Sequence, residues 1–80
     1  MARYFLHLHE CEIRTEDEQG FECETLLAAQ SIAMDAARDI MAEEVRAGRL
    51  CLSCHIAIED SDHRWVMTVP FAEAVKINGR

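Results

Sequence analysis

The chain has 80 residues, half of them hydrophobic, one proline and a formal net charge of −7 at pH 7. This length and composition are typical of one folded domain with a small core, and we expect that domain to span residues 1–80. The acidic balance disfavours binding to nucleic acid or anionic membranes, and no apolar run approaches the roughly 20 residues that cross a bilayer. Because no signal-peptide pattern opens the sequence, we expect a cytoplasmic protein.

The first strand is predicted from Arg3 to His9, where apolar and polar side chains alternate. The alternation separates two sets of side chains, Tyr4, Leu6 and Leu8 on one face and Phe5, His7 and His9 on the other. We expect the first set to contact a helix. The second set would then lie on the opposite sheet face, which a two-layer domain of this size does not cover by itself.

The chain is acidic from residue 10 to residue 24, with Arg14 as its one basic residue. A short strand around Cys11 to Arg14 would pair with the first strand, and residues 17–20 (Asp-Glu-Gln-Gly) predict a turn. A carboxylate-rich loop can bind calcium, but the ordered ligand spacing of an EF-hand loop is absent. We therefore assign no calcium site to this segment.

One long helix is predicted from Thr25 to about Ala47. The Thr25 hydroxyl can cap its first turn, and Gly48 follows its last turn, where a positive φ is favoured. One broad arc of this helix is rich in alanine: Leu26, Ala29, Ala33, Ala36, Ala37, Ile40 and Met41. A second apolar stripe flanks that arc and consists of Leu27, Met34, Met41 and Val45. We interpret this stripe as core packing or as a contact between subunits.

A strand hairpin follows the helix. A connector over residues 49–54 leads to a strand from His55 to Glu59, a turn over residues 60–63 and a returning strand from Arg64 to Val69. Pro70 ends the strand because proline has no amide hydrogen to donate, and residues 71–77 add a short turn or half-strand. This order predicts an α+β fold, a small antiparallel sheet of three to four strands with one long helix on one face.

Three segments resemble a bacterial family of small single-domain proteins catalogued as domain-of-unknown-function family 6894. They are residues 3–8 (Arg-Tyr-Phe-Leu-His-Leu), residues 17–22 (Asp-Glu-Gln-Gly-Phe-Glu) and residues 68–75 (Thr-Val-Pro-Phe-Ala-Glu-Ala-Val), with the alanine-rich helix between the last two. The resemblance implies a compact α+β module without an established activity or catalytic residues. Two features depart from the family pattern. The hairpin turn has His63 where the family usually has glycine, so we expect a turn that is strained or of another type. Cys51 and Cys54 are not part of the pattern.

The Cys51-Leu52-Ser53-Cys54-His55 segment has the spacing of a c-type haem attachment site. Haem attachment normally requires export, and the segment runs directly into a predicted strand, so we interpret the match as chance. Zinc is an alternative, with Cys51, Cys54 and His55 joined by Cys11, His7 or His9. A redox role for the Cys-x-x-Cys pair is a further alternative, although the surrounding pattern does not resemble thioredoxin. Reduced thiols packed as small apolar groups are the simplest interpretation.

No nucleophile elbow, phosphate loop or metalloprotease motif occurs, so we expect neither an enzyme nor a bound cofactor. The leading hypothesis is a non-catalytic interaction or regulatory module that forms a homodimer or binds another protein. The candidate interaction residues are Phe5, His7, His9 and His55 on the sheet face and Leu27 and Met34 on the helix stripe. The alternatives are a metal- or thiol-dependent site at Cys51, Cys54 and His55 and, less favoured by the charge, nucleic-acid binding.

Overall fold

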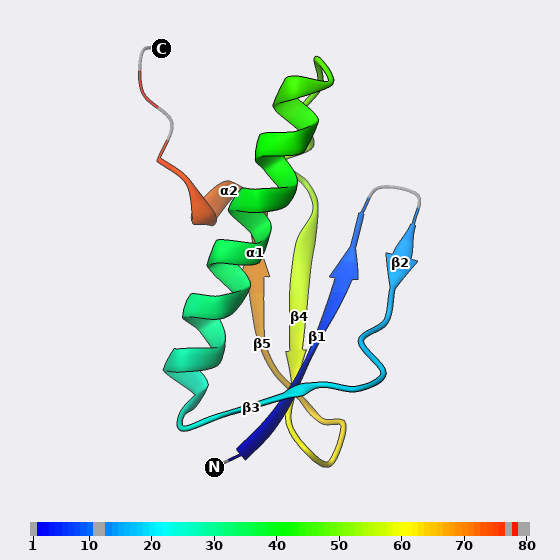
Figure 1. Cartoon of the computed structure of the whole chain (residues 1–80), viewed down its shortest axis with the longest axis vertical. Coiled ribbons are helices and arrows are strands. Elements are labelled where there is room, and N and C mark those ends of the chain that lie inside the picture. The colour runs from blue at the N-terminus through cyan, green and yellow to red at the C-terminus, as the bar shows by residue number, and fades with distance from the viewer. Residues whose placement is uncertain (1, 11–12, 77, 79–80) are drawn as a thin grey trace.

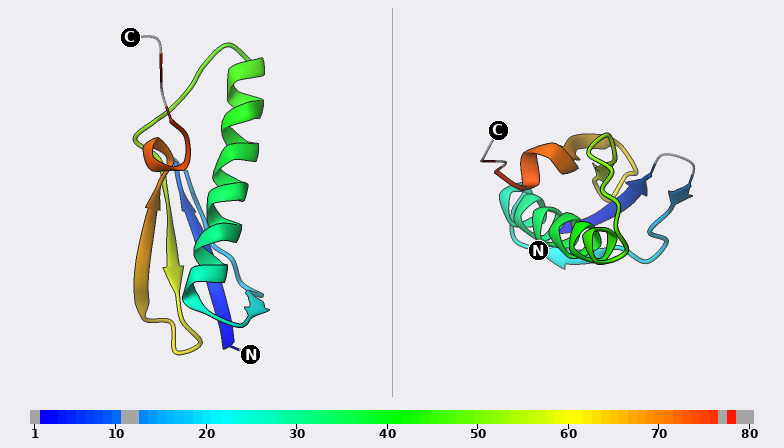
Figure 2. Two further views of the ribbon diagram at one scale, coloured as in Figure 1. Left: turned by 90° about the vertical axis from the view of Figure 1, so that its left-hand side faces the viewer. Right: turned by 90° about the horizontal axis from the view of Figure 1, so that it is seen from above.

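A computed structural model of the chain describes residues 2–10, 13–76 and 78. Within these residues the elements are β1 (Ala2–His9), β2 (Arg14–Thr15), β3 (Phe21–Cys23), α1 (Leu26–Arg46), β4 (His55–Glu59), β5 (Trp65–Pro70) and α2 (Phe71–Ala74). Helix α1 lies along one face of an antiparallel sheet, and α2 packs beside it at the end of β5 (Figures 1 and 2). The predicted α+β fold is confirmed.

The sheet contains one strand more than the upper prediction. Its order is β2-β1-β4-β5, and β3 also pairs with β1. Both short strands come from the acidic segment, and they pair with opposite ends of β1: Leu8 faces Thr15, whereas Tyr4 faces Phe21. The segment therefore returns along one edge of β1 in two pieces. The loop over residues 16–20 separates those pieces.

The loop over residues 16–20 is held by the carboxylate of Asp17. This carboxylate accepts hydrogen bonds from the backbone N–H groups of Leu6 at 3.2 Å and Gly20 at 2.9 Å. Asp17 therefore supplies the acceptor that a neighbouring strand would otherwise offer to the middle of β1. Gly20 has a φ of +69°, and a Cβ placed there would lie only 2.7 Å from the Tyr4 carbonyl oxygen. The predicted turn is thus present, and it packs tightly against β1.

Helix α1 begins and ends as the sequence predicts. The Thr25 hydroxyl accepts a hydrogen bond from the Ala28 N–H at 3.1 Å. At the other end Gly48 has a φ of +90°, and its N–H donates to the Val45 carbonyl. The Arg49 N–H donates to the Glu44 carbonyl at 2.9 Å, which completes a Schellman motif.

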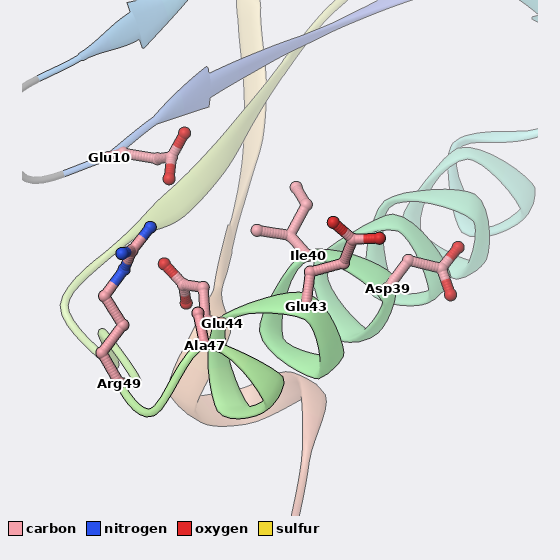
Figure 3. A pocket seen from close by; sticks show the side chains of 7 residues that line it. All are labelled: Glu10, Asp39, Ile40, Glu43, Glu44, Ala47 and Arg49. Atoms are coloured by element: carbon pink, nitrogen blue, oxygen red, sulfur yellow. The ribbon is translucent and has the colours of Figure 1, made fainter.

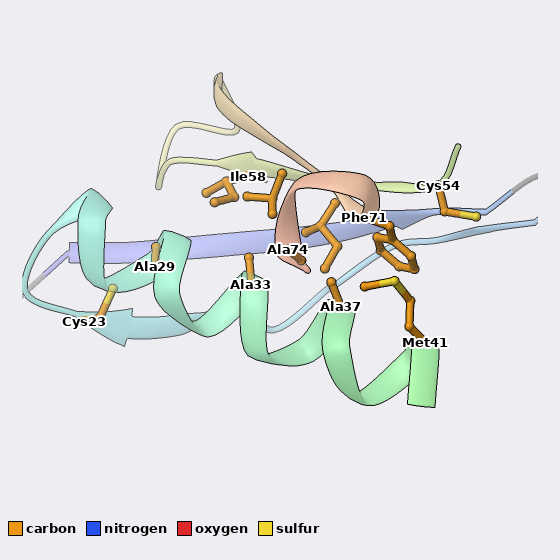
Figure 4. Close-up of a cluster of buried hydrophobic side chains, with 11 residues drawn as sticks. Cys23, Ala29, Ala33, Ala37, Met41, Cys54, Ile58, Phe71 and Ala74 are labelled. Atoms are coloured by element: carbon orange, nitrogen blue, oxygen red, sulfur yellow. The ribbon is translucent and has the colours of Figure 1, made fainter. Parts of the chain in front are cut away.

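The core lies between α1 and the sheet (Figure 4). Ala29, Ala33 and Ala37 are completely buried, and their small side chains let the helix approach the sheet closely. The predicted inner set of β1, namely Tyr4, Leu6 and Leu8, packs against this core as expected. Residues 71–74 form one helical turn, and the Phe71 ring is completely buried. Ile77, the last residue of the predicted turn or half-strand, lies outside the described residues.

The turn of the β4–β5 hairpin is strained, which is one of the two alternatives expected from the resemblance. His63 has a φ of +61°, a conformation that glycine adopts at lower cost. The Asp60 carbonyl accepts from the His63 N–H, and the Asp60 N–H donates to the Arg64 carbonyl, which defines a three-residue loop. The His63 ring stacks on Phe5 with 4.4 Å between ring centroids. This contact places the strained residue against the buried Phe5 ring.

Candidate functional site

The candidate site is a cleft at the C-terminal end of α1, formed by two adjoining cavities of about 460 and 330 Å³. The larger cavity is shown in Figure 3. Both cavities are lined by Glu10, Glu44 and Arg49. Glu10 follows β1, Glu44 belongs to the last turn of α1, and Arg49 opens the connector to β4. We refer to these two cavities together as the C-terminal cleft.

The C-terminal cleft is predominantly acidic. Its charged residues are the carboxylates of Glu10, Asp39, Glu43 and Glu44 and the guanidinium of Arg49. The C-terminal end of α1 adds the negative partial charge of its terminal carbonyls. Glu44 is only 9% exposed, and its carboxylate accepts a long hydrogen bond of 3.5 Å from the Cys51 N–H. The cleft therefore attracts cations more strongly than anions.

Two thiols lie against the smaller cavity of the cleft. The Cys54 thiol donates a hydrogen bond to the Cys51 sulfur, and the two Sγ atoms are 2.8 Å apart. Cys54 is 2% exposed, whereas Cys51 is half-buried, and its sulfur lies 3.3 Å from the Ser53 hydroxyl. Both cysteines therefore line the cavity, and Cys51 is the more exposed of the two.

His55 does not join these thiols. It begins β4 and stacks on His9, with 4.6 Å between ring centroids, whereas Cys54 belongs to the core. The reason is the alternation of a strand, which turns neighbouring side chains to opposite faces. Among the described residues no three His, Cys, Asp or Glu side chains are close enough to hold a metal ion. Cys11, the remaining cysteine considered for zinc, lies outside the described residues.

The outer sheet face is covered at Phe5 and His7, which are each 6% exposed. The expectation that this whole face is bare is therefore wrong. The Asp17 N–H donates to His7 Nδ1 at 3.1 Å, so His7 carries its proton on Nε2 and donates it to Glu59 at 2.8 Å. This hydrogen bond, reinforced by His63, lowers the pKa of Glu59 below its usual value. Loop 16–20 and the His63 ring provide the cover that the sequence pattern did not reveal.

His9 and His55 remain half-buried at the other end of the same face. They share the outer sheet face, as the sequence predicted. They also face each other across β1 and β4, and their rings stack nearly parallel. Burial, followed by repulsion from His55 and Arg14, lowers the pKa of His9. The pair therefore favours the neutral imidazole form of His9.

The predicted helix stripe is covered in its middle and open at its ends. Met41 is buried and Met34 is partly buried, whereas Leu27 and Val45 are 72% and 59% exposed. Helix α2 covers part of α1 here, and the Arg38 Nε–H donates to the Ala74 carbonyl at 2.7 Å. An apolar groove of about 420 Å³ lies beside the exposed end and is lined by Arg38, Met41, Ala42, Val45, Leu50 and Val75. We call this the apolar groove.

Sequence reasoning did not identify Glu10, Glu44 or Arg49 as parts of a site. One signal was present, because Glu44 falls on the helix arc that carries Ala33 and Ala37. A carboxylate on a buried arc is unusual and indicates a special environment. No comparable signal marked Glu10 or Arg49.

The model of the family described as "Domain of unknown function (DUF6894)" matches residues 3–72 of the chain. Neither the comparison with curated proteins nor the comparison with solved structures gives a match. Within the described part of the chain no helix has the length and apolar character needed to cross a membrane. The family match covers most of the 80 residues, and the chain therefore belongs to the DUF6894 family of domains of unknown function.

Proposed function

We propose that this domain is a non-catalytic interaction module that associates with a second copy of itself through α1. The observation that carries the proposal is the exposure of Leu27 and Val45, two apolar side chains at opposite ends of one helix stripe. Their shared position on one helix stripe is what distinguishes them from apolar side chains that are exposed singly elsewhere on the chain. The apolar groove beside Val45 supplies a concave partner for such a side chain.

The positions of Leu27 and Val45 suit a symmetric pair. About five full turns of 3.6 residues separate them, so they project from the same side of α1. When two copies of α1 run antiparallel about a two-fold axis, Leu27 of each copy lies opposite Val45 of the other, and the covered middle of the stripe lies between these two contacts. Such a contact is self-complementary and closes at two copies.

The free energy expected from this contact predicts a weak dimer. Burial of one large apolar side chain contributes roughly 1.5–3 kcal/mol, and the symmetric contact contains four such side chains. The loss of translational and rotational freedom costs about 4–15 kcal/mol, which offsets much of that gain. Each copy also carries a net charge of −7. Because salt screens the resulting repulsion, association strengthens as salt is added.

Sedimentation equilibrium at chain concentrations up to about 1 mM tests the proposal. We expect a monomer–dimer equilibrium for the unchanged chain and a monomer for Leu27→Glu and for Val45→Glu. Ile32→Glu is the matched control, because Ile32 is 42% exposed on a different side of the same helix. This control should dimerise as the unchanged chain does. A monomer at every concentration would overturn self-association, and an equal loss in Ile32→Glu would overturn the assigned surface.

A further inference from the structure

We infer that Cys51 and Cys54 form a thiol–disulfide site that reacts with low-molecular-weight disulfides, cationic ones in preference to anionic ones. The first observation is the 2.8 Å between the two sulfurs. Two sulfurs at this distance need only a small side-chain rotation to reach the S–S bond length of about 2.05 Å. The second observation is the cavity that both cysteines line, from which the half-buried Cys51 is more accessible to a small molecule than Cys54, which is 2% exposed.

The backbone holds the two cysteines from opposite sides of the connector. The Cys51 N–H donates to the carboxylate of Glu44, which belongs to α1. The Cys54 carbonyl accepts from the Phe71 N–H at 2.9 Å, at the junction of β5 and α2. The connector is thus anchored at both sulfur-bearing residues, and their proximity does not depend on a regular helix or strand between them.

The exposed fractions of the two cysteines indicate which thiol reacts first. Cys51 is half-buried beside the cavity, so its thiolate attacks one sulfur of the small disulfide and releases a first small thiolate. Cys54, 2% exposed, then attacks the Cys51 sulfur of the mixed disulfide and releases the second. The small disulfide gains two electrons, and the protons of the two protein thiols end on the two released small thiols. The protein gains one intramolecular disulfide.

The charges of the C-terminal cleft select the reagent. Glu10 and Glu44 line the same cavity as the thiols, and the adjoining cavity adds two further carboxylates. Arg49 is the cation shared by both cavities. A surface with this excess of negative charge concentrates cations and repels anions at low ionic strength. We therefore expect cystamine, a dication, to react about tenfold faster than the anionic oxidised glutathione.

The test incubates the reduced chain with excess cystamine or excess oxidised glutathione, alkylates the remaining thiols and maps the peptides by mass spectrometry. We expect a Cys51–Cys54 disulfide in the unchanged chain. Cys23→Ser is the matched control, because Cys23 is a buried cysteine of the same core and should not alter the result. Cys54→Ser should stop at a mixed disulfide on Cys51. In Cys51→Ser, Cys54 should be modified at least about tenfold more slowly than Cys51 is in the unchanged chain, because Cys54 is buried.

Three outcomes would overturn the inference. The first is alkylation of both Cys51 and Cys54 after exposure to excess disulfide, in a chain whose circular dichroism is unchanged. The second is a disulfide from either of them to Cys11 or Cys23. Equal rates with cystamine and oxidised glutathione at low salt would overturn the charge preference. The inference does not rest on the proposed dimer, and Val45→Glu should form the same disulfide whether or not it is monomeric.

Discussion

The two ends of α1 differ in how completely the rest of the chain encloses them. At the N-terminal end, β3 pairs with β1, and the thiol of buried Cys23 donates to the Thr25 carbonyl at 3.4 Å. At the C-terminal end, α1 extends past the strands (Figures 1 and 2), and the C-terminal cleft and the apolar groove surround its last turns. The first end is enclosed on its sheet side, although Leu27 on its outer side is 72% exposed, and the second end is bordered by cavities that leave surface for binding and chemistry.

The substitution with the largest expected effect tests whether the C-terminal end of α1, which we call the open end, rests on rigidly packed side chains. Phe71 is completely buried, and its ring lies close to Met41 at the base of the open end (Figure 4). We expect Phe71→Ala to lower the free energy of unfolding by about 3–5 kcal/mol, which would leave so small a domain largely unfolded. Circular dichroism and urea denaturation measure this change.

Trp65→Ala is the control for this prediction, because Trp65 is also aromatic but 65% exposed. Trp65→Ala should lower the free energy of unfolding by about 1 kcal/mol or less. If Phe71→Ala and Trp65→Ala unfold at similar urea concentrations, α2 does not anchor the open end. The contrast between an open surface and a rigid base would then fail.

The sequence predicted the elements whose causes are local. The alanine arc, the Thr25 cap and Gly48 all act within a few residues, and they specify α1 almost to the residue. The cover on the outer sheet face was not predictable in this way. It depends on the Asp17 carboxylate reaching the Leu6 N–H, a tertiary contact that replaces a strand partner.

The same distinction applies to the candidate site. The Cys-x-x-Cys spacing indicated that Cys51 and Cys54 are neighbours, and the structure brings their sulfurs together. The acidic cleft around them could not be predicted, because Glu10 and Glu44 belong to distant parts of the sequence that meet only in the folded chain. His55 was grouped with the cysteines by sequence distance alone. The strand alternation then separates it from Cys54.

A pair of glycine substitutions compares the two ends at the level of the backbone. Gly20 lies under Phe5 on the enclosed side, and a Cβ there would meet the Tyr4 carbonyl oxygen at 2.7 Å. Gly48 also has a positive φ, but a Cβ there would meet nothing within 4 Å. Left-handed backbone costs a non-glycine residue about 1–2 kcal/mol, and steric overlap adds about 1–3 kcal/mol at Gly20 only.

Urea denaturation should therefore show Gly20→Ala to be less stable than Gly48→Ala by about 1–3 kcal/mol. Both variants carry the same backbone penalty, so the difference isolates the packing around the loop over residues 16–20. Equal free energies of unfolding for the two variants would mean that this loop shifts readily to accommodate the added methyl group. The enclosed end would then be no tighter than the open one.

The smallest expected effect concerns the histidines at the two ends of the outer sheet face. His63 stacks on Phe5 at the covered end, and His9 stacks on His55 at the half-buried end. Burial and the nearby His55 lower the pKa of His9 from its usual 6.5. The neutral form of His9 therefore contributes stability above about pH 6.5, and that stability is lost as the pH falls through the lowered pKa.

We expect His55→Ala to raise the pKa of His9 toward its usual value. The substitution removes the repulsion from the His55 imidazolium and opens the His9 ring to water, and both changes favour the protonated form. NMR titration of the His9 ring protons measures the shift, with His63→Ala as the control, because His63 is not among the groups that lower this pKa. An unchanged or lower pKa of His9 in His55→Ala would show that the stacked pair is not electrostatically coupled. The pKa of His9 would then depend no more on His55 than it does on the control residue His63.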